Sequence, residues 1–243
     1  MSTLLKITIT AVLSLLLMSC NFDLNFNPGV RGNRNVQTME RNLDGDFNQI
    51  EVSRGLDVYL TQSDTPLLKV QADENLHDII VTEIDEGVLK IYSSENISYS
   101  EAQKVMVNVE DINYISATSG SDVYSTNTIE SNSIKLVTTS GADLEVEIDA
   151  QSTTLSSTSG SDIKVSGNTV TLSASATSGA DIKARDLISE SCTASVTSGA
   201  DIVVHATEKI TASATSGGDI TYYGNPKAVS ESDGVSGSIR KRM

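Results

Sequence analysis

The chain has 243 residues with 32 acidic and 17 basic side chains, which gives a formal net charge of −15 at pH 7. A body this acidic cannot hold nucleic acid by neutralising phosphates, and anionic lipid repels it. Two cysteines, no tryptophan and only three phenylalanines argue against a disulfide framework and against a large aromatic core.

The first residues have the pattern of a bacterial lipoprotein signal peptide. Lys6 precedes an apolar run over residues 7–17, which is too short to cross a bilayer comfortably. Leu17-Met18-Ser19-Cys20 then resembles a lipobox, in which cleavage leaves Cys20 as an acylated first residue. We predict a signal peptide over residues 1–19 and an outer-membrane lipid anchor at Cys20, on the periplasmic or the outer face. An ordinary secretory signal is the alternative.

The next segments lead from a linker into strands. Residues 20–45 are rich in Asn, Gly and Arg, and they predict a flexible tether from the membrane. Residues 46–116 predict a diverged N-terminal β-helical part, with about three turns between Gly55 and Gly120. Short alternating runs bounded by turn residues place its strands at residues 47–52, 58–61, 67–72, 79–84, 88–92 and 104–109.

A repeat organises residues 117–243. The block Thr-Ser-Gly-x-Asp-aliphatic occurs six times, with its glycines 18 to 21 residues apart, and a weaker copy at residues 235–239 predicts a C-terminal cap. A further copy at residues 50–59 aligns with residues 115–124. Small or apolar side chains alternate with polar ones between these blocks, which predicts strands with one buried face. Each glycine supplies the positive φ of a turn.

A period near 20 residues is the length of one turn of a parallel β-helix, whose turns stack ~4.8 Å apart. A propeller blade needs about 40 residues, and a helical solenoid conflicts with the period of two. The sequence therefore predicts an all-β parallel β-helix of about seven to ten turns. An uncapped end of such a stack would invite homo-oligomers through end-to-end or trimeric association.

Stacking would line up the motif aspartates on one edge of the helix. Neighbouring carboxylates ~4.8 Å apart repel by about 1 kcal/mol in water, so hydrogen bonds from turn N–H groups and Ser or Thr hydroxyls must offset the repulsion. Bridging Ca²⁺ is the alternative, because it prefers oxygen ligands, although the Gly-Gly-x-Gly-x-Asp calcium signature is absent. This candidate cation or ligand ladder consists of Asp122, Asp143, Asp162, Asp181, Asp201 and Asp219.

Other side chains carry less chemistry. The Thr and Ser before each glycine would form two hydroxyl columns, which are ordinary turn chemistry or a surface for glycan or ice. His77 and His205 lie outside any nucleophile motif and predict surface residues. Cys192 falls in an apolar column with Ile134 and Leu172, which predicts an inert core thiol. We expect no catalytic residues.

The same residues resemble the bacterial family called putative auto-transporter adhesin, head GIN domain. The resemblance covers about residues 40–240 and lies in Arg41-Asn42-Leu43, in residues 47–52, 55–62, 70–76 and 87–91, and in the Ser-Gly-x-Asp repeats. It implies a right-handed β-helix (a β-solenoid) on a lipoprotein or secreted chain, with no catalytic residues.

Together these observations predict a non-enzymatic cell-envelope lipoprotein, an adhesin or ligand-presenting module that takes a glycan or a protein. A structural envelope protein and a polysaccharide-acting enzyme of the same fold are the alternatives.

Overall fold

The computed structural model describes residues 29–242, and 68% of the chain lies in strands. The predicted signal peptide and Cys20 lie outside the described residues. Among these residues, no helix is long and apolar enough to cross a membrane.

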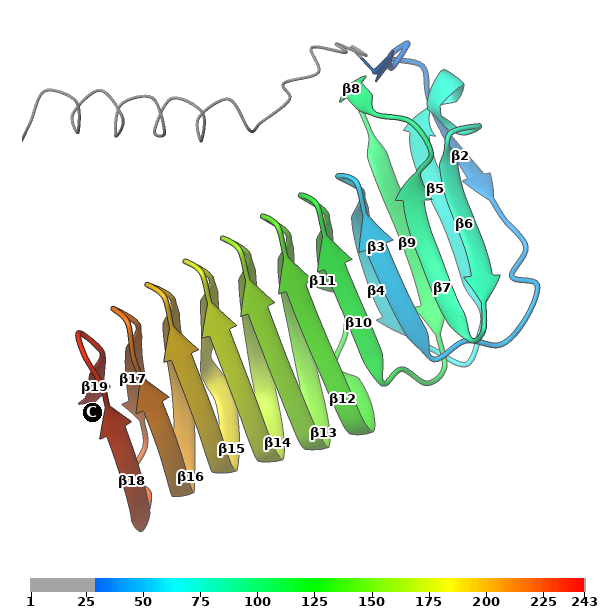
Figure 1. Cartoon of the computed structure of the whole chain (residues 1–243). Coiled ribbons are helices and arrows are strands. Elements are labelled where there is room, and N and C mark those ends of the chain that lie inside the picture. Colours follow the sequence, from blue (N-terminus) through cyan, green and yellow to red (C-terminus); the bar gives the residue numbers. More distant parts are fainter. Residues whose placement is uncertain (1–28, 243) are drawn as a thin grey trace, which may run out of the picture.

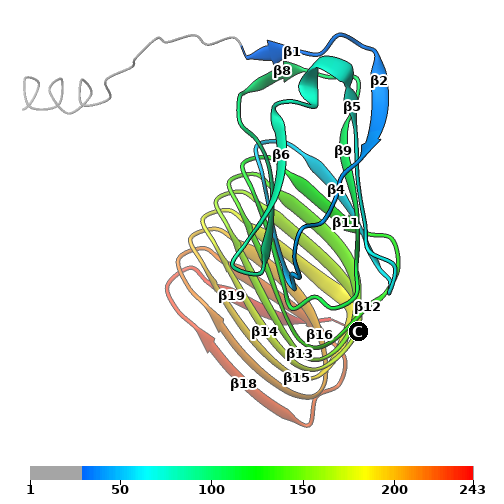
Figure 2. The same ribbon diagram turned by 90° about the vertical axis from the view of Figure 1, so that its right-hand side faces the viewer.

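Most of the molecule is a β-solenoid of about seven turns, as the repeat predicts (Figure 1). Each turn contributes one strand to each of two parallel stacks, and Figure 2 shows the turns as flattened loops lying one behind another. The strands that end at a Ser-Gly corner, or lie in register with such strands, form the first stack: β7 (Val88–Ser93), β3 (Gln49–Ser53), β10 (Tyr114–Thr118), β12 (Ile129–Thr139), the second halves of β13 (Asp143–Thr158), β14 (Asp162–Thr177), β15 (Asp181–Thr197) and β16 (Asp201–Ala214), and β18 (Ala228–Asp233).

The strands that follow the corner form the second stack. The long strands β13 to β16 contribute to both stacks, because each bends once along its length. The second stack consists of β9 (Gln103–Val109), β4 (Asp57–Gln62), β11 (Asp122–Ser125), the first halves of β13 to β16, β17 (Asp219–Tyr223) and β19 (Ser238–Lys241).

Equivalent residues of the repeat lie in register. β13 and β14 pair in parallel from Asp143↔Asp162 to Thr158↔Thr177. The side chain after each aspartate points inward. Because equivalent residues are in register, these side chains stack into one continuous aliphatic column, and its burial stabilises the fold through the hydrophobic effect. Its members, all at most 1% exposed, are Val58, Val123, Leu144, Ile163, Ile182, Ile202 and Ile220.

The corners use two residues in the left-handed region, where glycine alone was predicted. Ser159 and Gly160 have φ values of 60° and 67°, and the other motif corners repeat this pair of positive values. Two successive positive φ values are what a type I′ turn requires, and its twist matches that of the strands. The Gly160 N–H donates to the Ser178 carbonyl of the next turn at 3.2 Å, so the corners are hydrogen-bonded to one another as well.

The N-terminal turns are not stacked in chain order. β3 and β4 pair in parallel with β10 and β11, so the corner at Gly55 lies directly against the corner at Gly120. The intervening chain supplies one further turn, β7 and β9, on the other side of β3 and β4. The prediction of about three turns between these glycines is therefore wrong, because much of this segment forms antiparallel strands.

Those antiparallel strands close the N-terminal end of the solenoid. β5 (Leu67–Asp73) pairs antiparallel with β9, β2 (Val36–Glu40) with β5, and β6 (Ile80–Asp85) with β7. The short helix η1 (Glu74–Leu76) and the small parallel pair of β1 (Val30–Arg31) with β8 (Ile97–Tyr99) complete this head. The head lies beside the first turns in Figure 1. The N-terminal part thus departs from a pure β-helix.

The predicted tether is partly built into the head. Residues 30–40 include β1 and β2, and the Arg34 N–H donates to the Asp73 carboxylate at 3.0 Å. Asp73 is fully buried and also accepts from the Glu101 N–H at 3.1 Å. The Arg41 guanidinium donates to the Ile80 carbonyl at 2.6 Å. A flexible tether is therefore wrong for residues 30–41, because distant backbone and carboxylate groups hold this segment.

The histidine prediction also needs correction. His77 is only 7% exposed, because it follows η1 and packs under β2, with Nε2 3.3 Å from the Gln37 carbonyl oxygen. His205 lies within β16 and is half-buried.

Candidate functional site

The motif aspartates form one continuous ladder, which we call the aspartate ladder. Parallel register places each aspartate beside its equivalent in the next turn, from Asp122↔Asp143 through Asp201↔Asp219. The ladder continues beyond the six predicted members, because Asp57 pairs with Asp122. Lys104 borders Asp57 at one end, and Ser238 borders Asp219 at the other.

Burial and mutual repulsion act together on the ladder. Partial desolvation, followed by the charges of neighbouring aspartates, raises the pKa of Asp57, Asp143 and Asp201 above the usual aspartate range. Raised carboxyl pKa values mean that the ionised ladder opposes folding to a small extent. Such a row of carboxylates attracts cationic groups.

Neighbouring side chains offset part of this repulsion. The Lys183 ammonium lies 2.6 Å from the Asp162 carboxylate and 3.8 Å from that of Asp181. The Tyr124 hydroxyl donates to Asp122 at 3.3 Å, and burial with the adjacent aspartate raises the Tyr124 pKa to about 12. Ser and Thr hydroxyls were expected to serve the ladder, but within residues 29–242 the corner hydroxyls pair with each other instead.

The ladder does not gather its carboxylates around one point. Each turn contributes a single aspartate, and no group of three or more His, Cys, Asp or Glu side chains in the described part of the chain is arranged to hold a metal ion. Whether Ca²⁺ binds along the ladder stays a prediction.

The corner hydroxyls form the second repeated feature. The hydroxyl oxygens of adjacent Thr and Ser lie 3.3 Å apart at Thr139–Ser140 and 3.5 Å apart at Thr158–Ser159. The corner serines are exposed, and the corners follow each other along one edge of the solenoid (Figure 1). This edge therefore repeats one set of hydroxyl groups in every turn.

Two features escaped the sequence reasoning. The Tyr59 and Tyr124 rings stack with centroids 5.4 Å apart, next to the ladder, and Lys104 lies over Tyr59. Their alignment in the repeat could have indicated this stack. Cys192, in contrast, is buried as predicted, and desolvation raises the pKa of its thiol to about 12.

The second missed feature is a groove where the head meets the solenoid, which we call the junction groove. One hollow of about 670 Å³ is lined by Leu43, Phe47, Pro66 and Val109 at its apolar side and by Asp111 at its polar side. Local sequence patterns contain no signal for it, because its walls come from segments that only the tertiary fold brings together.

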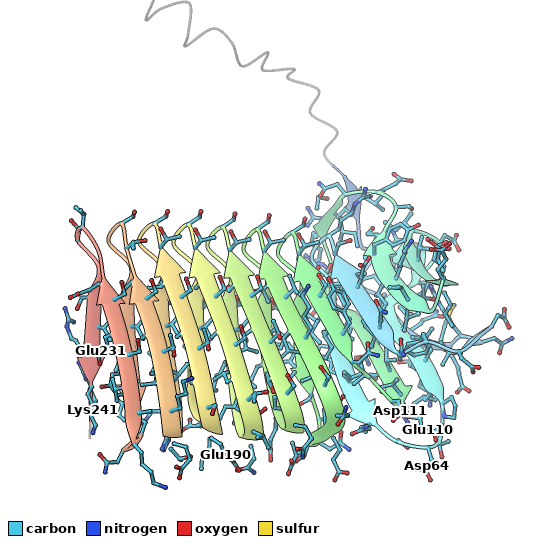
Figure 3. All side chains as sticks on the ribbon, turned by 60° about the horizontal axis from the view of Figure 1, so that its bottom comes forward. Asp64, Glu110, Asp111, Glu190, Glu231 and Lys241 are labelled. Atoms are coloured by element: carbon cyan, nitrogen blue, oxygen red, sulfur yellow. The ribbon has the colours of Figure 1, made fainter. Side chains whose placement is uncertain are left out.

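The hollow continues along the solenoid. Asp111 also lines two adjoining hollows, which extend to Asn132 and then to Glu130 and Asp149. Figure 3 labels Glu110 and Asp111 together with Asp64 at the edge of the molecule near the head. The groove thus has apolar and acidic side chains in the hollow at the head, and polar and acidic side chains along the first solenoid turns.

Comparison with known proteins shows which family has this architecture. A family model described as putative auto-transporter adhesin, head GIN domain, matches residues 46–226. The chain belongs to this family.

Solved structures share the fold of this GIN-domain chain. A putative adhesin from Bacteroides fragilis NCTC 9343 matches with a TM-score of 0.82 at 21% identity, over 88% of this chain and 100% of that one. A protein named putative lipid binding protein from Parabacteroides distasonis ATCC 8503 matches with a TM-score of 0.72 at 25% identity, over 88% and 99% of the two chains. A putative adhesin from Parabacteroides merdae ATCC 43184 matches with a TM-score of 0.69 at 20% identity, over the same shares. A search of curated proteins finds no match.

Proposed function

We propose that this GIN-domain protein is a non-enzymatic, lipid-anchored adhesin that presents the corner edge of its solenoid to a ligand outside the cell. The family is described as an adhesin family, which indicates a cell-envelope or surface protein. The predicted acylation of Cys20 would supply the anchor.

The observation that carries the proposal is the repetition of identical polar groups. Every motif turn presents one aspartate and one Thr–Ser hydroxyl pair at the same edge, and the turns lie ~4.8 Å apart. A row of weak, equivalent contacts binds a repetitive ligand far more tightly than one contact does, because later contacts are intramolecular. A glycan or an extended protein has such repetition.

A binding assay on glycan arrays tests whether the ligand is a glycan. We expect specific binding that falls when Asp162→Asn and Asp181→Asn are combined, and a matched variant with Asp186→Asn and Glu190→Gln serves as the control. If the folded protein binds no glycan on the array, a purely structural envelope protein is favoured. If it releases reducing ends from polysaccharides, an enzyme is favoured. The proposal needs no metal, so EDTA leaves binding unchanged, and heat from Ca²⁺ binding in calorimetry would contradict this part.

The location is tested on whole cells. Protease added to intact cells should remove the protein from the surface, and replacing Cys20 with Ser should release it into the soluble fraction. Protection from protease in intact cells, with cleavage after the outer membrane is opened, would place the protein in the periplasm and exclude a direct role in adhesion.

A further inference from the structure

None of the described residues 29–242 covers the apolar side of the junction groove. Leu43 and Phe47 are only partly buried, although they pack against the hydrophobic core, and Pro66 beside them is exposed. These side chains border a hollow of about 670 Å³. Apolar surface lining a hollow gains free energy when a ligand displaces water from it.

The other side of the groove has an unbalanced negative charge. Asp46, Glu110 and Asp111 border the first hollow, and Glu130 and Asp149 border its continuation. Within residues 29–242, none of these carboxylates forms a salt bridge, whereas the ladder aspartates Asp162 and Asp181 are paired with Lys183. A ligand with positive charge would find unused partners here, and one with negative charge would be repelled.

Carboxamide side chains line all three hollows of the groove. Asn48 and Asp111 line both the first and the second hollow, and Asn132 lines the second and the third. A carboxamide both donates and accepts hydrogen bonds, so it can pair with the N–H and C=O groups of an extended peptide. The first hollow therefore combines apolar, carboxamide and carboxylate side chains, and the two adjoining hollows add further carboxamides and carboxylates.

We propose that the junction groove binds an extended basic peptide segment of a partner protein, with an apolar side chain against Phe47 and lysine or arginine side chains against Asp111 and Glu130. Charge complementarity selects this occupant, because a groove lined by both apolar side chains and unpaired carboxylates matches a peptide that carries both apolar and cationic residues. The site lies apart from the aspartate ladder, so it adds a second kind of ligand to the proposed adhesin and does not depend on the first.

Fluorescence anisotropy with short labelled peptides tests the proposal. The probe is an alternating Lys-Leu peptide of about eight residues, which spans roughly 26 Å when extended. It is compared with Glu-Leu and Lys-Ser peptides of equal length, on the secreted protein carrying Cys20→Ser. We expect the Lys-Leu peptide to bind at physiological salt, the Lys-Ser peptide to bind more weakly, and the Glu-Leu peptide not to bind.

Matched variants separate the groove from general attraction to an acidic protein. Asp111→Asn with Glu130→Gln should weaken Lys-Leu binding by about tenfold. Asp186→Asn with Glu190→Gln removes the same charge elsewhere and should change binding less than twofold, with circular dichroism confirming the fold of each variant. The ladder variant with Asp162→Asn and Asp181→Asn should still bind the peptide, so failure of the adhesin proposal and failure of this one are distinguishable. Equal weakening by the two acidic pairs, or displacement of the probe by a neutral oligosaccharide alone, would overturn the proposal.

Discussion

The Asp57 and Asp122 carboxylates lie in register on the neighbouring parallel strands β4 and β11, although β5 to β10 lie between these strands along the chain. Burial and the charge of Asp122 raise the pKa of Asp57. Asp57, which lies outside the regular repeats of residues 117–243, therefore extends the aspartate ladder into the N-terminal turn. Its carboxylates interact as one row.

The ladder should make stability depend on pH in an unusual direction. Burial, then Asp122 and Asp162, raise the pKa of Asp143, so the folded state holds this proton more tightly than the unfolded chain does. The ionised carboxylate then costs stability above the folded pKa, and the cost disappears below the usual value of 3.8. We expect Asp143→Asn to raise Tm at pH 7 by roughly 2 °C and to have no effect near pH 3. Scanning calorimetry across this pH range checks it, with exposed Glu190→Gln as control; a lower Tm at pH 7 would contradict it.

The corner glycines should be required for backbone conformation and not for space. A Cβ at Gly160 would meet no atom within 4 Å, but φ is 67°, so Gly160→Ala should lower the free energy of unfolding by about 1 kcal/mol. Gly160→Asn should cost less, because asparagine tolerates the left-handed region. Gly167→Ala should cost more than either, since its Cβ would overlap the Ile148 carbonyl oxygen. Urea denaturation measures all three, and an equal loss at both glycines would refute the distinction.

A buried hydroxyl cluster should show strong coupling. Thr138, Ser157 and Ser161 are at most 1% exposed, and the Ser157 hydroxyl oxygen lies 2.9 Å from that of Thr138 and 3.0 Å from that of Ser161. Thr138→Val alone leaves the serines short of a partner and should destabilise by about 1–2 kcal/mol.

The triple variant with Thr138→Val, Ser157→Ala and Ser161→Ala should recover much of that loss, because other turns have Val196, Ala176 and Ala180 at these positions. A cycle of urea denaturation on the single and combined variants measures the coupling. Simple addition of the single effects would show that the hydroxyls act independently.

The Cys192 thiol should be protected in the folded protein. Its pKa of about 12 and its burial leave almost no accessible thiolate at neutral pH. In a Cys20→Ser variant, where Cys192 is the only cysteine, iodoacetamide labelling should be at least about a hundredfold slower than in denaturant. Mass spectrometry follows the reaction, and rapid labelling under native conditions would show that the column opens.

The last turn should protect the open end of the solenoid. Asp233 and Lys241 are exposed, but they lie in register with the buried residues Ala214 and Tyr222 of the preceding turn. Charged side chains therefore stand in the last turn where the preceding turn has core residues, and Figure 3 labels Lys241 at this end. Charges at such positions discourage further stacking. Asp233→Val with Lys241→Val should increase self-association, as measured by analytical ultracentrifugation. Unchanged sedimentation at the highest soluble concentration would argue against this role.

The internal repeat was sufficient to predict the solenoid, the register of the ladder and the burial of Cys192. Side-chain alternation and the corner residues act between neighbours in one turn, and stacking identical turns extends them without new information. The alignment of residues 50–59 with residues 115–124 predicted the same corner in both segments, but it did not predict that β3 and β4 pair directly with β10 and β11.

Only the tertiary structure shows how the strands at the N-terminal end pair with one another. β7 and β9 lie on the far side of β3 and β4, residues 30–41 join the head, and Asp111 reaches the same groove as Phe47. Each of these depends on which strand edge a segment distant in the sequence pairs with. Local periodicity describes which face of a strand is buried, but it cannot specify that partner.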